Sequence, residues 1–231
     1  MIHRLLLALC ATLTSAAAAP PGTAALLCPG GEVTVEAEDR ATATRVCDQI
    51  AEIRPALAAC GLQQSAPLTV YLVDEADLPS GPFLGSYAAG SNEIRLARPD
   101  RLPDMFLPDH PFARLDPGLM FQSLLVHELS HAFLDQVECT RTRCVAEHEY
   151  VAYAMQLSFL PEEARMTLLG TSEDGLDPAP VPEESLNDFT ALLDPVHFAN
   201  RVWRHFSQPE NGCDFIRRIQ SGEVDLRLPP L

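Results

Sequence analysis

The stretch Val126-His127-Glu128-Leu129-Ser130-His131-Ala132-Phe133 carries two histidines and one glutamate at helical spacing. At about 100° per residue, residues four apart share one face of a helix, so the imidazoles of His127 and His131 can reach a single ion. Glu128 is turned around the helix from them, where its carboxylate can take a proton from a water that the metal activates. The pattern predicts a zinc site with Glu128 as its general base.

A helix whose polar residues face solvent is the alternative interpretation of this stretch. Leu129 and Ala132 lie among the polar residues, and the flanking residues are also mostly apolar. Two imidazoles and a carboxylate buried there without partners would be costly. We therefore expect a buried helix that binds a metal ion.

Residues 1–19 predict a secretory signal. Arg4 supplies a positive start, Leu5 to Leu13 form an apolar segment too short to span a bilayer, and small alanines follow. A lipoprotein signal ending at Cys10 is a weaker alternative, because Leu9 is large for the residue before a lipidated cysteine. No later run reaches the roughly 20 apolar residues of a membrane span. We expect an exported protein, secreted or periplasmic.

Cysteine usage agrees with export. The chain has seven cysteines, and removal of Cys10 leaves an even set suited to three disulfides. Cys139 and Cys144 are the expected pair, because only four residues separate them. A cysteine-based zinc site is disfavoured, since no pair has the two-residue spacing of a zinc knuckle. The remaining four are Cys28, Cys47, Cys60 and Cys213.

The charge limits the classes of partner. The full chain is at −16, and loss of Arg4 with the signal gives −16 − 1 = −17, with histidine counted as neutral. All sixteen basic residues are arginine, which excludes Schiff-base chemistry on lysine. An acidic chain without basic clusters is a poor candidate for binding nucleic acid or anionic lipid.

Hydrophobic periodicity predicts strands and helices in an α+β order, with a hairpin before the metal-binding helix and a helical C-terminal part after it. Residues 20–66 are expected to support a catalytic core over residues 67–231. A proline-rich loop over residues 98–118 leads into the metal-binding helix. We expect strands over 32–37, 68–73, 84–88 and 93–97, and helices over 38–60, 146–160, 161–170, 186–193, 196–206 and 213–220.

The helix after the motif offers a third ligand, in Glu147 and Glu149. Here the sequence resembles the gluzincin zinc metallopeptidases, in which a glutamate on the following helix completes the site, and Glu149-Tyr150-Val151-Ala152 is similar to their Glu-Gly-Phe-Ala stretch. Glu149 is preferred, because the seventeen residues between it and His131 are close to the family's interval. Glu147 is the alternative ligand. Both could instead be solvated residues of a first helical turn, and His148 is expected at the surface.

The resemblance implies further roles. His197 stands where aminopeptidase-type gluzincins carry a tyrosine that donates to the oxyanion, although a structural histidine is the alternative. Residues 93–97 would be the edge strand that pairs with an extended substrate. Two features depart from the family: Tyr153 replaces an acidic residue four positions beyond Glu149, and no Gly-x-Met-Glu-Asn motif is present.

The resemblance implies an α+β zincin-like domain, in which a small mixed sheet with a hairpin edge packs on the metal-binding helix. The sequence also resembles an uncharacterised secreted bacterial family of this clan. The expected function is that of a secreted zinc metallopeptidase acting on peptide or protein substrates. His127, His131 and Glu149 would bind Zn²⁺, with Glu128 and His197 as catalytic residues. The alternative is a catalytically inactive periplasmic module that binds or inhibits and keeps the metal for stability.

Overall fold

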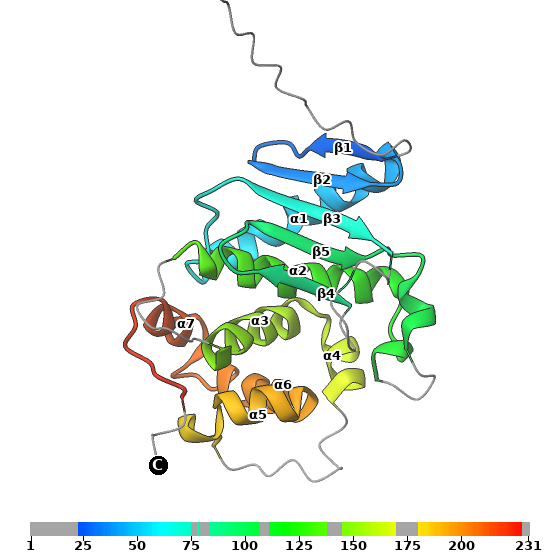
Figure 1. The fold of residues 1–231 in the computed structure, drawn as a ribbon. Helices are drawn as coiled ribbons and strands as arrows, with labels where there is room; N and C mark the ends of the chain where they lie inside the picture. The colour runs from blue at the N-terminus through cyan, green and yellow to red at the C-terminus, as the bar shows by residue number, and fades with distance from the viewer. Residues whose placement is uncertain are drawn as a thin grey trace, which may run out of the picture.

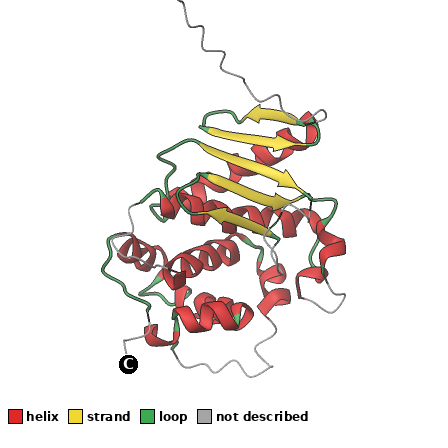
Figure 2. Ribbon diagram, viewed as in Figure 1, coloured by secondary structure: helices red, strands yellow, loops and turns green. Residues whose placement is uncertain are grey.

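A computed structural model describes residues 23–74, 78, 84–106, 111–137, 145–169 and 180–227 (Figure 1). The expected signal and the expected Cys139–Cys144 pair lie outside these residues. The described part combines one five-stranded sheet with seven α-helices (Figure 2), which confirms the predicted mixture of α and β structure.

The sheet is mixed and has the order β1-β2-β3-β5-β4. Its two central pairings are parallel, and both outer pairings are antiparallel. The antiparallel β4–β5 pair is the predicted hairpin, and β1 is a strand that the sequence analysis did not predict. The strands are β1 (Ala24–Leu27), β2 (Val33–Ala37), β3 (Leu68–Val73), β4 (Gly85–Ala88) and β5 (Glu93–Ala97).

The prediction that residues 93–97 form the sheet edge is wrong. β5 lies between β3 and β4, with Val70 of β3 opposite Ile94, so β4 is the outer strand. Ile94 and Leu96 are fully buried, whereas Arg95 between them is exposed. This alternation indicates that one face of the sheet is covered. It does not distinguish an inner strand from an edge strand.

Two long helices cover one face of the sheet, behind the strands in Figure 1. α1 (Arg40–Ala59) begins at Asp39, whose carboxylate accepts from the backbone N–H of Thr42. α2 (Pro117–Asp135) begins in the same way at Asp116, with a proline in its first turn. The N-terminal strands and both helices contribute to one continuous core that extends to Leu226, so the described residues up to 66 share the core of the rest.

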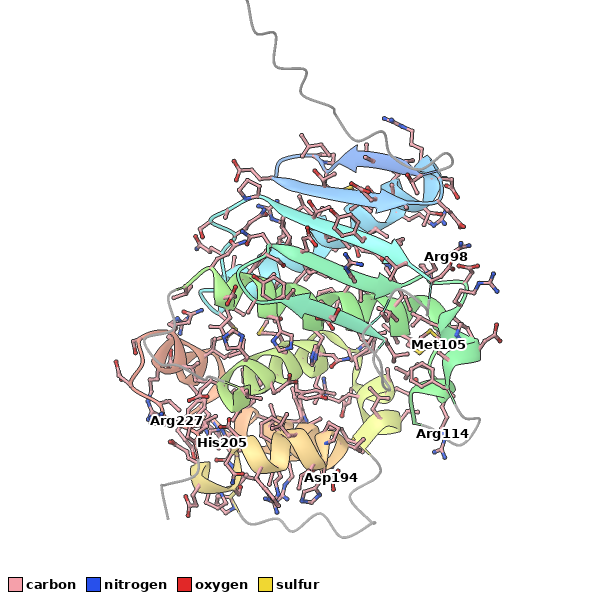
Figure 3. The ribbon with its side chains drawn as sticks, viewed as in Figure 1. Arg98, Met105, Arg114, Asp194, His205 and Arg227 are labelled. Atoms are coloured by element: carbon pink, nitrogen blue, oxygen red, sulfur yellow. A yellow bond between two sulfur atoms is a disulfide. The ribbon has the colours of Figure 1, made fainter. Side chains whose placement is uncertain are left out.

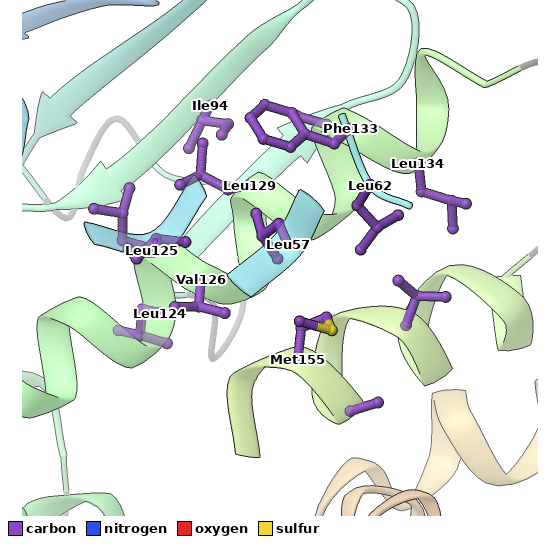
Figure 4. Close-up of a cluster of buried hydrophobic side chains, with 14 of the residues drawn as sticks. Leu57, Leu62, Ile94, Leu124, Leu125, Val126, Leu129, Phe133, Leu134 and Met155 are labelled. Carbon is purple, nitrogen blue, oxygen red and sulfur yellow. The ribbon is translucent and has the colours of Figure 1, made fainter. Parts of the chain in front are cut away.

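The remaining helices form a layer on the side of α2 away from the sheet, in which α3 packs on α2, and α5 and α6 pack on α3. α2 has β5 and α1 on one side and α3 on the other, and Figure 4 shows its apolar side chains between Ile94, Leu57 and Met155. The expected loop over residues 98–118 contains two short 3₁₀ helices, η2 (Leu102–Met105) and η3 (Pro111–Arg114). The layer comprises α3 (Val145–Phe159), α4 (Glu162–Leu169), α5 (Asp188–Leu193), α6 (Pro195–Phe206) and α7 (Gly212–Gln220).

Two disulfides connect the ends of these elements. Cys28, just after β1, is bonded to Cys47 of α1. Cys60, at the end of α1, is bonded to Cys213 of α7, 153 residues later. Disulfides are typical of an extracellular protein. None of the helices in the described ranges is long and apolar enough to cross a membrane.

Candidate metal centre

The middle of α2 and the first turns of α3 meet beneath β4. The side chains of His127, His131 and Glu149 converge there, and they form a group that could hold a metal ion. The Nε2 atoms of the two histidines are 3.1 Å apart. The Glu149 carboxylate oxygens lie 3.6 Å from each Nε2. The three residues that the sequence predicts as ligands are therefore brought together.

A buried amide orients the first histidine. Nδ1 of His127 is 3.0 Å from Oε1 of Gln156, a residue of α3 that is only 2% exposed. Nε2 of His127 consequently points towards His131 and Glu149. The sequence analysis missed Gln156, and the available signal was its spacing of seven residues, two helical turns, from Glu149.

Burial keeps both imidazoles neutral. Desolvation lowers the pKa of His127 to about 4, although the hydrogen bond to Gln156 opposes this shift. It also lowers the pKa of His131 well below its ordinary value, and the neighbouring imidazoles of His127 and His148 add to the effect. Neutral imidazole is the form that binds metal ions.

Burial acts in the opposite sense on the two carboxyl groups. Desolvation raises the pKa of Glu128 to about 8, and the nearby charge of Glu149 adds to this shift. Desolvation also raises the pKa of Glu149 to about 7, although 29% of its side chain is exposed. A nearby cation would stabilise the ionised forms of these two carboxyl groups and lower their pKa values.

Strand β4 covers Glu128. The backbone of Tyr87 lies close enough to the Glu128 carboxylate to oppose the rise of its pKa, and Tyr87 donates its hydroxyl to Oδ2 of Asp135 at 2.6 Å. Asp135, at the end of α2, further accepts from the backbone N–H of Gly90 at 2.7 Å. The outer hairpin is thus attached to the end of the metal-binding helix by two hydrogen bonds to Asp135.

Glu147 occupies a different environment from Glu149. Its side chain is 2% exposed, and Oε1 accepts from the backbone N–H of Leu226 at 3.1 Å. The alternative interpretation, in which both glutamates are solvated, is therefore wrong, because the C-terminal segment covers the first turn of α3. Glu147 attaches that segment to the helix, whereas Glu149 faces the histidines.

Two aromatic residues of α3 flank the histidines. The ring of His148 stacks on His131 with centroids 6.0 Å apart and is half-buried, so its expected surface position is wrong. The ring of Tyr153 contacts His127 edge-on at 4.8 Å. Burial, followed by the charges of Glu149 and Glu128, raises the pKa of Tyr153, so its hydroxyl keeps its proton at neutral pH.

His197 is not part of this cluster. It is an exposed residue in the first turn of α6, and its backbone N–H donates to Oδ1 of Asp194 at 3.0 Å. Asp194 lies in the outer helical layer, away from the sheet (Figure 3). Among the described residues, no hydrogen bond or ring contact links the His197 side chain to the three converging residues.

Comparison with known proteins places the chain in a family. A model described as a family of unknown function, DUF6639, matches residues 33–229. The chain belongs to this family. The matched range contains both helices of the candidate site and all five residues named above as ligands or catalytic groups. No curated protein and no solved structure matches the chain.

Proposed function

We propose that this protein is a secreted zinc-dependent metallopeptidase of the gluzincin type. The observation that carries the proposal is the convergence of His127, His131 and Glu149 around one point, next to the buried carboxyl group of Glu128. The two disulfides suit the extracellular setting that the proposal requires.

The donor atoms fit zinc in kind and in spacing. Tetrahedral zinc holds nitrogen and oxygen ligands at about 2.0–2.1 Å, which places neighbouring donor atoms roughly 3.3 Å apart. The observed separations are 3.1 Å between the nitrogens and 3.6 Å from each nitrogen to a carboxylate oxygen. Three protein ligands leave one coordination position open, which is typical of a catalytic site and not of a structural one.

The raised pKa values of the two carboxyl groups also support the binding of a cation at this site. The raised pKa values of Glu128 and Glu149 show that the protein alone stabilises their ionised forms poorly. A divalent cation among the three ligands would lower both values, because an opposite charge favours the ionised form. When bound, zinc would supply Lewis acidity towards a carbonyl oxygen and towards water.

The protein's own groups would then handle the protons. Ionised Glu128, beside the backbone of Tyr87, would accept a proton from the attacking water and pass it to the leaving amine. Tyr153 keeps its hydroxyl proton and lies against His127, so it is a candidate donor to the developing oxyanion. His197, exposed on α6, is the weaker candidate for that role.

The sheet edge offers a binding mode for a peptide. Within the described strands, β4 is paired on one side only, with β5. Its other side can accept an extended chain by main-chain hydrogen bonds. A substrate bound along β4 would run past Glu128, because this strand lies directly over that residue.

Metal content and peptide cleavage, measured together on wild type and Glu128→Gln, test the proposal. We expect wild type to bind one zinc ion and to cleave members of a mixed peptide library. Glu128→Gln should bind zinc equally and cleave about 10²–10⁴-fold more slowly. Zinc retained in both His127→Ala and Glu149→Ala would overturn the metal site. A zinc-loaded wild type that cleaves nothing would instead favour the inactive binding module.

A further inference from the structure

A buried chain of three hydrogen bonds leads from the backbone of α2 to His127. Ser123, four residues before His127, donates its hydroxyl to the carbonyl oxygen of Met120 at 2.8 Å. Nε2 of Gln156 donates to Oγ of Ser123 at 3.4 Å, and Oε1 of Gln156 faces Nδ1 of His127 at 3.0 Å. Ser123 and Gln156 are 1% and 2% exposed, so water does not substitute for these partners.

The chain has a definite direction. A serine hydroxyl has one proton, and Ser123 gives it to the Met120 carbonyl, so its oxygen can only accept from Gln156. The amide nitrogen of Gln156 must therefore face Ser123, and the amide oxygen must face His127. An oxygen acceptor at this position requires that Nδ1 of His127 carries the proton.

The proton on Nδ1 determines the state of the opposite ring nitrogen, Nε2. A neutral imidazole with its proton on Nδ1 has a lone pair on Nε2, and this atom lies 3.1 Å from Nε2 of His131 and 3.6 Å from Glu149. Without the acceptor, either ring nitrogen could carry the proton. A proton on Nε2 would occupy the position where a metal ion binds.

We infer that Ser123 and Gln156 are positioning residues that select the Nδ1–H tautomer of His127 before any metal ion binds. The consequence for metal affinity rests on the proposed function, whereas the tautomer itself can be measured in metal-free protein. The selecting group is an uncharged amide. Gln156 therefore orients His127 without adding a third carboxyl group beside Glu128 and Glu149.

The substitutions separate tautomer selection from packing. Gln156→Met keeps a side chain of similar volume and removes the acceptor. Gln156→Glu keeps an acceptor oxygen in either protonation state and serves as the rescue variant. Ser123→Ala removes the group that orients the amide. Ser130→Ala is the matched control, because Ser130 is equally buried in α2 and its hydroxyl donates to the Val126 carbonyl at 2.7 Å.

Nitrogen-15 NMR of metal-free protein labelled at histidine, at pH 7, reads the tautomer directly. The His127 signals are assigned with His127→Ala. We expect Nδ1–H alone in wild type, Gln156→Glu and Ser130→Ala, and a mixture or Nε2–H in Gln156→Met and Ser123→Ala. An Nε2–H tautomer in wild type overturns the inference. An unchanged tautomer in Gln156→Met or, if that variant does not fold, in Ser123→Ala also overturns it.

Zinc affinity, measured by competition with a chelator, provides the second readout. Gln156→Met should weaken zinc binding about 10–100-fold, the usual effect of losing such a partner. Gln156→Glu and Ser130→Ala should stay within a few-fold of wild type. Equal affinity in wild type and Gln156→Met would overturn the positioning role. If wild type binds no zinc, the proposed function fails, and the NMR result still decides the tautomer.

Discussion

Gly85 of β4 lies directly against the carboxylate of Glu128. A methyl group at Gly85 would come within 2.8 Å of Glu128 Oε1 and within 2.6 Å of Cδ2 of Leu96. The outer strand can pass this close to the proposed base only because the position has no side chain. Gly85 is the first residue of β4, and a glycine in a strand often marks such a close approach.

Gly85→Ala should therefore disturb the base without removing the metal ligands. We expect β4 or the Glu128 side chain to shift, because overpacking of this kind costs about 1–3 kcal/mol. Peptide cleavage should fall at least about tenfold, with zinc content unchanged. Gly118→Ala adds the same methyl group where only Oδ1 of Asp116 lies nearby, at 3.1 Å, and should keep activity. Equal activity in the two variants would contradict the role assigned to Gly85.

A matched pair of substitutions on α3 separates the two possible third ligands. Glu149→Gln removes the carboxylate that faces the histidines, and we expect zinc affinity to fall about 100-fold or more. Glu147→Gln removes a charge two residues away and keeps an oxygen that can accept from the Leu226 N–H. It should bind zinc as wild type does. The reverse pattern would make Glu147 the ligand.

The stability of the metal-free protein should fall as the pH rises above 6.5. Folding raises the pKa of Glu128 from 4.5 to about 8, so between these values the folded chain holds a proton that the unfolded chain releases. The lowered pKa of His127 acts only below pH 6.5 and leaves this window unaffected. One such group changes the free energy of unfolding by at most about 1.4 kcal/mol per pH unit, or roughly 3–6 °C in Tm.

Thermal melts between pH 6.5 and 8.5 check this effect. The metal-free wild type should lose Tm with rising pH, and Glu128→Gln should lose less, with the remainder due to Glu149, whose pKa is raised to about 7. Zinc should reverse the trend, since it binds the ionised carboxylate. A Tm that does not depend on pH in metal-free wild type would disprove the assigned pKa of Glu128.

Tyr153→Phe and His197→Ala distinguish the two candidate oxyanion donors. Loss of a donor to the transition state lowers kcat with little change in KM, by about 10²–10³-fold for a well-placed group. We expect this effect in Tyr153→Phe, because the ring contacts His127, and none in His197→Ala, because that side chain is exposed on α6. Zinc content should be unchanged in both. A reduced kcat in His197→Ala alone would reverse the assignment.

The two disulfides should contribute unequally to stability. Loop-closure entropy predicts about 5 kcal/mol for the Cys60–Cys213 loop and about 3 kcal/mol for the shorter Cys28–Cys47 loop. Cys213→Ser should therefore lower the free energy of unfolding more than Cys28→Ser, as measured by urea denaturation. Thiol titration of the denatured mature protein, which lacks Cys10, should give no free thiol without reductant, because we also expect Cys139 to pair with Cys144.

The sequence was sufficient to predict those features whose geometry follows from the spacing of residues within one element. Helical spacing alone predicted that His127 and His131 lie together, whereas Glu149 was preferred because of the interval in the family that the sequence resembles, and its carboxylate faces both histidines. Strand β3 was predicted with its observed bounds, because a continuous β-branched run has few alternatives. The histidine pair and β3 depend on local periodicity, which a single sequence carries.

Features that depend on neighbours from elsewhere in the chain were not predictable in this way. β4 is the edge strand because β5 lies between it and β3. The alternation of buried and exposed residues in a single strand does not encode this order. Glu147 is buried because Leu226, 79 residues later, folds back over it. Gln156 of α3 contacts His127 of α2, and no motif in either helix predicts this hydrogen bond.

The bridge between Cys60 and Cys213 also imposes an order on the formation of the native covalent structure. Synthesis starts at the amino terminus, so Cys28 and Cys47 are both available early. Cys60 is also made early, but its partner Cys213 is synthesised 153 residues later. During that interval Cys139 and Cys144 emerge before the correct partner does. The native pairing therefore skips two nearer thiols, and maturation should depend on a disulfide isomerase.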